Sequence, residues 1–336
     1  MKYQVQRLSR DFILENGGIL VRPEIAYSTY GELNGDKSNV FMVCHALTAN
    51  SEVDDWWKGL FGEGNIIDPT KYFVICINNL GSPYGSASPK SSDNAGERYG
   101  MTFPEYTIRD TAALHLAFLE QLKIDQVHTI IGGSCGGNIA QEIAFDLKER
   151  LRKLIIMCCS AMETPWVIAI HESQRIVLEG DSSLNDNQDN TAELGLRGAR
   201  AFALPFYRSH PSFKLRQQEG DIDKINDFKA ASYIRYQGEK FVERYDAQCY
   251  YKQLNALDTH NIGRNRGGPE KGLSQITAKT LSIGFSTDLL IPVAEQRFLA
   301  EHIPNSDYKE IETLFGHDAF LIETEQIRRV IEEWDQ

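Results

Sequence analysis

The chain has 336 residues, of which 42% are hydrophobic and 24% are charged, so its composition is that of an ordinary globular protein. Its formal net charge is −12, with no run of Lys and Arg to offset it, which argues against nucleic-acid binding. It has no stretch of about 18 uninterrupted apolar residues, and the N-terminal MKYQVQRLSRDFILENGG lacks an apolar h-region, so neither a membrane span nor a secretory signal is expected.

The first 150 residues alternate short apolar runs with helical patterns. The runs are VFMVC (40–44), YFVICIN (72–78), VHTIIGG (127–133) and KLIIMCC (153–159). Near-continuous hydrophobicity with many β-branched residues is typical of strands buried on both faces of a parallel sheet. Residues 105–122 and 136–149 show the three- and four-residue apolar spacing of amphipathic helices. Such alternation indicates βαβ units, and residues 1–39 are expected to add antiparallel edge strands.

The pattern changes after Cys159 and returns near the C-terminus. Residues 164–274 are mainly helical in character, with polar interruptions, and TLSIGF (280–285) then restores a buried strand. A helix at 292–302, a strand DYKEIET (307–313) and a final helix at about 318–334 follow. We therefore predict an α/β-hydrolase fold: a mostly parallel central sheet with helices on both faces, formed by residues 1–163 and 275–336 and interrupted by a helical lid at 164–274.

Six cysteines lie at positions 44, 76, 135, 158, 159 and 249, and no two form a CxxC pair. Four of them fall in apolar runs that have the character of buried strands. They are therefore interpreted as small core residues and not as a disulfide framework or a zinc site. Free thiols of this kind are typical of a reducing compartment, which predicts a cytoplasmic protein.

The strongest motif is Gly132-Gly133-Ser134-Cys135-Gly136, a G-x-S-x-G pattern directly between the strand VHTII and a helix. A serine in that setting lies on a very tight turn, with its hydroxyl exposed at the carboxyl edge of the sheet. The same turn places the Cys135 N–H at a helix start, where it can stabilise a developing oxyanion. The motif predicts Ser134 as a nucleophile; the alternative is a glycine-rich turn with an incidental serine.

A serine hydroxyl needs a base and a group that orients the base. In this fold the partners follow in the order Ser, acid, His, each just after a later strand. Asp288 follows TLSIGFST and His317 follows KEIETLFG, so these two residues complete a predicted triad. Asp288 could instead be a simple helix N-cap. A second oxyanion donor is expected in the loop after the third core strand, CHALT (44–48), where the Leu47 N–H is the candidate.

Beyond these motifs, the chain resembles the homoserine O-acetyltransferase family along nearly its whole length. The matching segments, in consistent order, are CHALTANSEVDDWW (44–57), NNLGSPYGSASP (78–89), FPEYTIRD (103–110), GGSCGGNIAQE (132–142), GLRGARAFALPFYRS (195–209), SYIRYQGEKFVERYDAQCYYKQLNALDTH (232–260), STDLLIPVAEQ (286–296) and GHDAFLIE (316–323). The lid segment around YQGEKFVERYDA is far more specific than G-x-S-x-G. The resemblance implies the same triad and oxyanion donors. It also implies that Arg200, helped by Tyr207, holds the substrate carboxylate and that Asp318 meets the substrate amine.

The resemblance implies acetyl transfer from acetyl-CoA to the hydroxyl of L-homoserine, in methionine synthesis, through an acyl-serine. Acetyl-CoA would be a co-substrate, with no permanently bound cofactor and no metal, and family members are commonly homodimers joined through the lid. Other interpretations remain open: succinyl-CoA as donor or serine as acceptor, a hydrolase with the same triad, or a catalytically inactive binding protein. The stretches 86–94 and 160–172, with Met162, Trp166 and His171, depart from the family pattern, as does Cys135, where Met is frequent.

Overall fold

The computed structural model describes residues 3–93 and 95–336; Met1 and Lys2 of the predicted N-terminal edge, and Asn94 of the atypical 86–94 stretch, lie outside the described residues. Within them an eight-stranded sheet has the order β1-β4-β6-β5-β7-β8-β9-β10. Its strands are β1 (Gln4–Arg7), β4 (Glu24–Tyr30), β5 (Val40–Cys44), β6 (Phe73–Ile77), β7 (Val127–Gly133), β8 (Leu151–Met157), β9 (Lys279–Phe285) and β10 (Ser306–Ile311).

The pairing from β6 through β10 is parallel, whereas β1 and β4 add antiparallel pairs at one edge. The strands β2 (Phe12–Ile13) and β3 (Ile19–Leu20) form a small separate sheet. Every residue of β5 is buried, as expected for a strand covered on both faces. The predicted α/β-hydrolase fold class, with a mostly parallel sheet flanked by helices, is confirmed.

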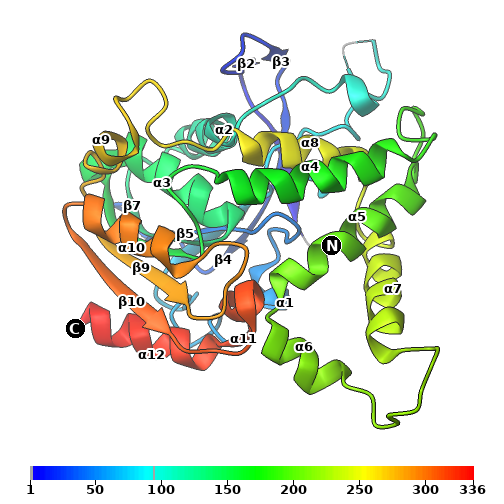
Figure 1. The fold of residues 1–336 in the computed structure, drawn as a ribbon. Helices are drawn as coiled ribbons and strands as arrows, with labels where there is room; N and C mark the ends of the chain where they lie inside the picture. The colour runs from blue at the N-terminus through cyan, green and yellow to red at the C-terminus, as the bar shows by residue number, and fades with distance from the viewer. Residues whose placement is uncertain (1–2, 94) are drawn as a thin grey trace.

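Helices cover both faces of the sheet, and each face has its own apolar core. The helices α2 (Ile108–Gln121), α3 (Cys135–Leu147) and α10 (Val293–His302) bury their apolar side chains in one cluster. The helices α1 (Val53–Trp56) and α12 (Thr324–Asp335) bury theirs in a second cluster on the opposite face (Figure 1). This arrangement fixes the carboxyl edge of the sheet, where the loops after β5, β7, β8, β9 and β10 gather.

Residues 164–274 leave the sheet after β8 and return to it at β9. Their helices are α4 (Pro165–Glu179), α5 (Glu193–Tyr207), α6 (His210–Gln217), α7 (Lys229–Val242), α8 (Ala247–Asp258) and α9 (Pro269–Leu273). The start of helix α4 is well defined by its sequence. The Thr164 side chain caps the helix by accepting a hydrogen bond from the Val167 N–H, and Pro165 occupies the first turn. Figure 1 shows α4 and α8 lying side by side above the sheet, while α5, α6 and α7 extend away from it.

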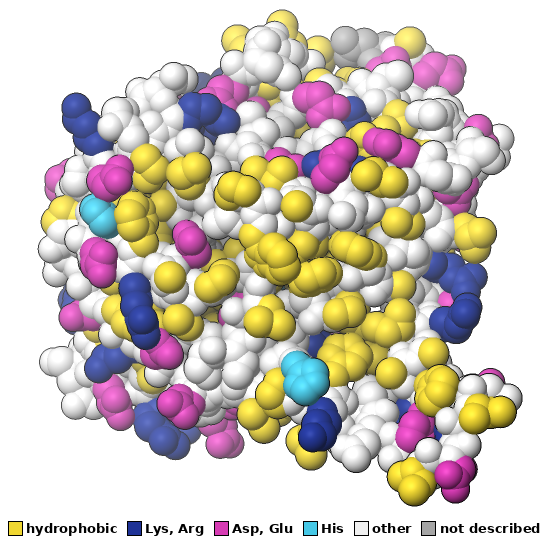
Figure 2. All heavy atoms as spheres, in the orientation of Figure 1, with side chains coloured by type: hydrophobic (Ala, Val, Ile, Leu, Met, Phe, Trp, Pro, Cys, Tyr) yellow, Lys and Arg dark blue, Asp and Glu magenta, His cyan; other side chains and the backbone are white. Residues whose placement is uncertain are grey.

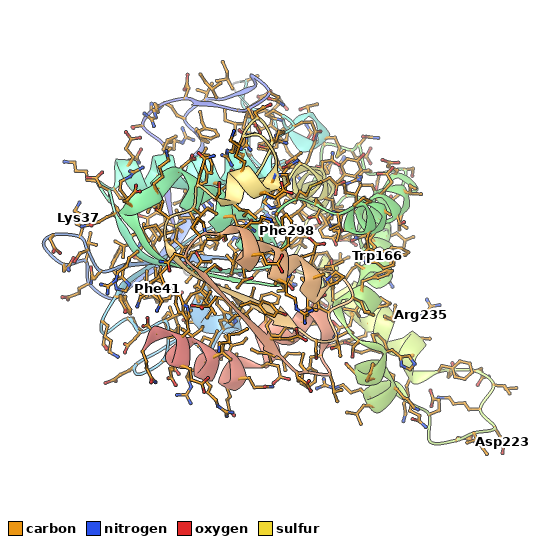
Figure 3. All side chains as sticks on the ribbon, turned by 60° about the vertical axis from the view of Figure 1, so that its left-hand side comes forward. Lys37, Phe41, Trp166, Asp223, Arg235 and Phe298 are labelled. Carbon is orange, nitrogen blue, oxygen red and sulfur yellow. The ribbon has the colours of Figure 1, made fainter. Side chains whose placement is uncertain are left out.

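The far end of this segment is its most exposed part. The connection between α6 and α7 projects from the body of the molecule, with Asp223 at its tip (Figure 3). Two apolar side chains of this connection are almost fully exposed, Ile222 at 94% and Ile225 at 87%. Figure 2 shows the hydrophobic side chains of this face of the molecule in yellow. By contrast with this exposed connection, the chain just after α8 is held against the body of the molecule. The guanidinium of Arg109, in α2, donates a hydrogen bond to the Asn261 carbonyl at 3.2 Å.

The C-terminal helix differs from the prediction. Instead of one helix over 318–334, the chain forms a 3-10 turn η3 (Gly316–Asp318), a short helix α11 (Ala319–Ile322) and then α12. The break falls at Glu323, whose carboxylate accepts a hydrogen bond from the Thr313 hydroxyl at 2.6 Å. The side chain is thus held against the loop after β10, which keeps the turn carrying His317 apart from α12. Among the described residues, no helix has both the length and the apolar character that crossing a bilayer requires.

Candidate active site

The turn from β7 into α3 carries Ser134 in a strained conformation, with φ 55° and ψ −129°. A non-glycine residue there costs about 1–3 kcal/mol, which the surrounding structure must offset. The turn is fixed by the Ser134 N–H, which donates to the Met157 carbonyl at 3.0 Å, and by two glycines that neighbouring backbone approaches closely. A Cβ on Gly136 would lie 2.0 Å from the Cys44 carbonyl oxygen, and one on Gly132 would lie 2.4 Å from the Gly136 carbonyl oxygen. Only glycine fits at these two positions.

Ser134, His317 and Asp288 form a continuous hydrogen-bonded chain. The Nε2 atom of His317 lies 2.8 Å from the Ser134 Oγ, and its Nδ1 lies 2.8 Å from the Asp288 Oδ2. The second Asp288 oxygen accepts from the Leu290 and Ile291 backbone N–H groups, each at 2.9 Å. The Asp288 carboxylate is therefore oriented from both sides, and the geometry is that of a nucleophile, a base and a group that orients the base.

The electrostatics around His317 favour its protonated form. Burial, the largest single effect, lowers the pKa of the imidazole, but the adjacent Asp288 carboxylate, together with Asp318 and Glu163, acts in the opposite direction, and the pKa is raised above its ordinary value. A raised pKa strengthens His317 as an acceptor of the Ser134 proton. The turn that carries His317 depends on Gly316, which has φ 65° and on which a Cβ would lie 2.6 Å from the Arg208 carbonyl carbon.

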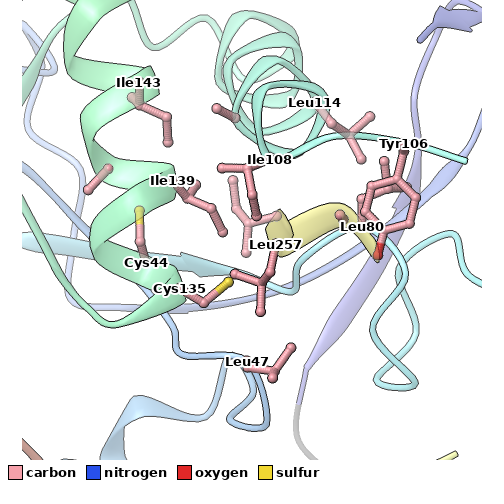
Figure 4. Packing of buried hydrophobic residues seen from close by; sticks show 14 of the residues in the cluster. Cys44, Leu47, Leu80, Tyr106, Ile108, Leu114, Cys135, Ile139, Ile143 and Leu257 are labelled. Atoms are coloured by element: carbon pink, nitrogen blue, oxygen red, sulfur yellow. The ribbon is translucent and has the colours of Figure 1, made fainter. Parts of the chain in front are cut away.

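The two predicted oxyanion donors come from different elements that meet at the cavity containing Ser134. Cys135 is the first residue of α3, and Leu47 belongs to the loop after β5; Figure 4 shows both close to Leu257 of α8. Neither backbone N–H has a hydrogen-bond partner among the described residues. Both residues line the cavity that contains Ser134. This placement leaves two donors free for a developing negative charge.

A cavity of about 470 Å³ lies over the triad, between the sheet edge and the helices that follow β8. Its lining includes Leu47, Ser134, Cys135, Asn138, Glu163, Val167, His171, Arg200, Tyr207, Arg244, Leu290, Ile291, His317 and Asp318. The cavity therefore brings together all the predicted site residues except Asp288, which lies behind His317. This volume can hold a small substrate beside Ser134 together with one arm of a second, larger substrate.

Arg200 and Asp318 differ in how their charges are compensated. The Arg200 guanidinium carbon lies 5.1 Å from the Tyr207 ring centre and 5.0 Å from that of Phe241, and among the described residues it makes no salt bridge. Asp318 is paired, since its Oδ2 lies 3.0 Å from the Nε of Arg208. Burial raises the pKa of Asp318, while Arg208 and Arg200 act in the opposite direction. The cavity thus contains a cation that acts on Asp318 at a distance but, within the described residues, forms no salt bridge that would occupy its guanidinium.

Several polar residues that line this cavity were not predicted as site residues, among them Glu163, His171 and Arg244. The Nδ1 of His171 lies 2.6 Å from the Asp258 Oδ1. Arg208, which pairs with Asp318, was also not predicted, although it is not part of the lining. A partial signal existed within the stretch 160–172, because Val167 and His171 are four residues apart on α4 and so share one helix face, whereas Glu163 lies before the helix begins at Pro165. The other two unusual residues do not line the cavity: Met162 and Trp166 are 42% and 52% exposed.

Among the described residues, one group could supply three ligand atoms to a metal ion: Cys158, Asp288 and His317, whose ligand atoms lie within 4.8 Å of one another. Two of these residues already form the Asp288–His317 hydrogen bond. The Cys158 thiol is fully buried, which raises its pKa well above the ordinary value and disfavours the thiolate that a metal requires. The arrangement fits acid–base chemistry better than metal coordination.

Comparisons with known proteins agree with this geometry. A family model described as alpha/beta hydrolase fold matches residues 39–324. A homoserine O-acetyltransferase of Cyclobacterium marinum is 41% identical over 322 residues, which are 96% of this chain and 92% of that protein. At this identity and coverage, the relationship is one of family and not of fold alone.

Two solved structures show how widely the fold is shared. A homoserine O-acetyltransferase from Bacillus anthracis superposes with a TM-score of 0.91 at 24% identity, covering 99% of this chain and 97% of that one. Esterase E22 superposes with a TM-score of 0.89 at 21% identity, covering 100% of both chains. Structural likeness alone therefore does not separate a transferase from an esterase, and the residues of the cavity have to do so.

Proposed function

This chain belongs to the homoserine O-acetyltransferase family of α/β-hydrolase-fold enzymes, and we propose that Ser134, His317 and Asp288 carry its transfer of an acetyl group from acetyl-CoA to the hydroxyl of L-homoserine. The observation that carries the proposal is the chain of two 2.8 Å hydrogen bonds from Asp288 through His317 to Ser134, at a cavity that also contains Arg200. A base that is oriented in this way activates a hydroxyl for acyl transfer.

In the first half-reaction, His317 accepts the Ser134 proton as Oγ attacks the thioester carbon. The resulting oxyanion lies between the N–H groups of Leu47 and Cys135, which stabilise it. Collapse of this intermediate breaks the carbon–sulfur bond, and the thiolate leaves as CoA with the proton from His317. The product of this step is an acetyl ester of Ser134.

In the second half-reaction, His317 removes the proton from the homoserine hydroxyl, whose oxygen attacks the ester carbon of acetyl-Ser134. The same N–H groups receive the oxyanion, and the bond to the Ser134 Oγ breaks as His317 returns the proton to it. We propose that Arg200, with Tyr207, holds the carboxylate of homoserine and that Asp318 meets its ammonium group. Arg200 suits this role because, among the described residues, its guanidinium makes no salt bridge.

The competing function is that of an esterase, in which water takes the acyl group. The unpaired Arg200 in the cavity favours the transferase, because an ester hydrolase that accepts water needs no fixed cation for an acceptor carboxylate. The apolar residues Val167, Leu290 and Ile291 form one packed cluster at the cavity, which limits the space for water. Sustained turnover of acetyl-CoA by the enzyme should accordingly depend on added homoserine.

The covalent route is tested by supplying one substrate alone. Enzyme incubated with acetyl-CoA and no acceptor is expected to release one CoA per active site and to gain one acetyl group on the peptide that contains Ser134, as ping-pong kinetics require. Mass spectrometry of the intact chain and of its peptides measures both outcomes. If no CoA appears until homoserine is added, the reaction is a direct transfer and the acyl-serine proposal is wrong.

We also propose that the protein is a homodimer joined through the segment that follows β8. The support is the exposure of apolar side chains on α5, α6 and the α6–α7 connection, where Leu194 is 70%, Leu215 is 74% and Ile222 is 94% exposed. Such side chains are typical of an interface. Light scattering is expected to give twice the chain mass of 38.0 kDa, and I222K/I225K to give the mass of one chain. A wild-type protein with the mass of one chain would refute the dimer.

A further inference from the structure

Glu163 is a buried acid in the active-site cavity, and no salt bridge joins it to a cation among the described residues. It is 5% exposed, and its one side-chain hydrogen bond within the described chain is accepted from the backbone N–H of Thr164, at 3.2 Å. Its backbone is held firmly, since the Glu163 N–H donates to the His260 carbonyl at 2.9 Å. A buried carboxyl that is fixed in place and left unpaired has a cost in stability, so its presence beside the nucleophile calls for a functional reason.

The position of Glu163 follows from the path of the chain after β8. The strand ends beside the nucleophile, and the chain then crosses the first turns of α3, where the Gln141 amide donates to the Ser160 carbonyl at 3.0 Å. Glu163 therefore enters the cavity on the side of Cys135 and Asn138, which belong to α3 and line the same cavity. Consistent with this placement, the Glu163 charge adds to burial in raising the pKa of the Cys135 thiol.

This side of the cavity presents oxygen atoms that lack a cationic partner. Besides Glu163, the Oδ1 of Asn138 is buried there and has no hydrogen-bond partner among the described residues. Arg200 belongs to α5, and it is absent from the main charges that act on Glu163. An acyl group on Ser134, with its carbonyl oxygen at the Cys135 N–H, would extend its chain into these surroundings.

We propose that Glu163, when ionised, selects the acyl group, accepting the short neutral chain of an acetyl donor and rejecting acyl chains that end in a carboxylate. The inference rests on the proposed acyl-serine route, and it names which class of donor that route takes. An acetyl group brings no charge toward Glu163 and Asn138. A succinyl group would place its free carboxylate beside the Glu163 carboxyl, which makes no salt bridge with an arginine or lysine within the described residues.

The charged and titratable groups around Glu163 make its rejection of anions depend on pH. They come from each element packed against it: Cys135 of α3, Cys159 after β8, His171 of α4, Asp258 and His260 at the end of α8, Glu295 of α10 and His317 of η3. Burial, with Asp258 and Glu295, raises the pKa of Glu163 to about 8, against the opposing effects of the Thr164 N–H and His317. Glu163 is thus largely neutral at pH 7 and ionises as the pH rises through its pKa.

The protonation state of Glu163 sets the direction in which the donor preference changes with pH. Below its pKa, Glu163 carries a proton and the succinyl carboxylate meets a neutral acid. Above its pKa, two carboxylates face each other, whereas the acetyl group remains neutral throughout. The ratio of kcat/KM for acetyl-CoA to that for succinyl-CoA should therefore rise by about tenfold or more between about pH 7 and about pH 9.

The test measures this ratio across that pH range, at saturating homoserine, from the rate of CoA release. The wild type should show the rise, and Glu163→Gln should show a flat ratio with a larger share of succinyl transfer at high pH. Glu295→Gln is the matched control, because Glu295 raises the pKa of Glu163 without lining the cavity. This control should keep the rise and move it to lower pH.

The possible results distinguish the role of Glu163 from the proposed transfer of acetyl to homoserine. A wild-type ratio that does not change with pH, or a ratio that changes equally in E163Q, overturns the role of Glu163 while leaving acetyl transfer to homoserine intact. If E163Q instead raises the KM for homoserine and leaves the donor ratio unchanged, Glu163 contacts the acceptor and the assignment is also wrong. Absence of homoserine-dependent CoA release from either donor refutes the proposed function itself. If E163Q does not fold, a flat wild-type ratio, or a rise that Glu295→Gln does not move to lower pH, still overturns the role of Glu163.

Discussion

Replacing Ser134 with alanine is expected to lower the rate of acetyl transfer by about 10⁴-fold or more, since loss of a triad member removes the nucleophile around which the other groups act. The variant should form no acetyl-enzyme with acetyl-CoA. It should still fold, because the strained turn is held by the Ser134 backbone N–H and by the close approach at Gly136, and both survive the substitution. The substitution removes only the Oγ atom, whose hydrogen bond to the His317 Nε2 measures 2.8 Å.

Ser82→Ala is the matched control for this variant. Ser82 is fully buried like a core residue, its hydroxyl has no hydrogen-bond partner among the described residues, and it does not line the active-site cavity. Its removal should leave the rate within a small factor of the wild type. Steady-state CoA release and circular dichroism measure activity and fold for both variants. Near-normal transfer by Ser134→Ala, with its fold intact, would refute covalent catalysis at this site.

The meeting of the three proposed triad residues was predictable because each is tied to a strand. Ser134, Asp288 and His317 each come shortly after a run whose hydrophobicity or alternation marks a strand, and parallel strands bring their carboxyl ends to one edge. Close approach of the backbone at Gly136 restricts that position further, so the sequence motif has a steric cause. The fold class could be predicted from the same regularities.

The rest of the site could not be predicted from spacing, because it depends on how helices after β8 lie over the sheet. Arg208, at the end of α5, reaches Asp318 only because α5 packs against the turn η3. Glu163 has the sequence context of an ordinary polar residue before a helix, and only the path over α3 turns it into the cavity. The break at Glu323 likewise depends on a hydroxyl from the loop after β10.

The residues that would distinguish a transferase from an esterase also belong to these helices and not to the sheet. Esterase E22 shares the fold at a TM-score of 0.89, so a sheet with this nucleophile turn is compatible with either outcome. What a transferase needs in addition is a fixed site for the acceptor that competes with water. In this chain, Arg200 on α5 is a candidate to supply one, because its guanidinium lines the cavity, lies against two aromatic rings and makes no salt bridge among the described residues.

Substitution of Arg200 should therefore damage the second half-reaction and spare the first. A charge-assisted bidentate contact is worth roughly 1.5–3 kcal/mol, so Arg200→Ala is expected to lower kcat/KM for homoserine by about tenfold to a hundredfold. Formation of acetyl-Ser134 from acetyl-CoA should continue at nearly the wild-type rate. Arg200→Lys should recover only part of the loss, because an ammonium group cannot reproduce the planar fork of a guanidinium. Rapid-quench measurement of the acyl-enzyme and steady-state kinetics separate the two half-reactions.

Two controls make this result specific to the acceptor carboxylate. Arg197→Ala removes an arginine from the same helix that is paired with Glu239 at 2.7 Å and does not line the cavity, so homoserine kinetics should be unchanged. L-homoserinol keeps the hydroxyl and the amine of homoserine but lacks its carboxylate. It should be a poor acceptor for the wild type and almost indifferent to Arg200→Ala, because homoserinol has no carboxylate for Arg200 to bind. Equal losses with homoserine and homoserinol would mean that Arg200 supports the packing of α5 against Phe241 of α7, and the acceptor carboxylate would then have to be bound elsewhere.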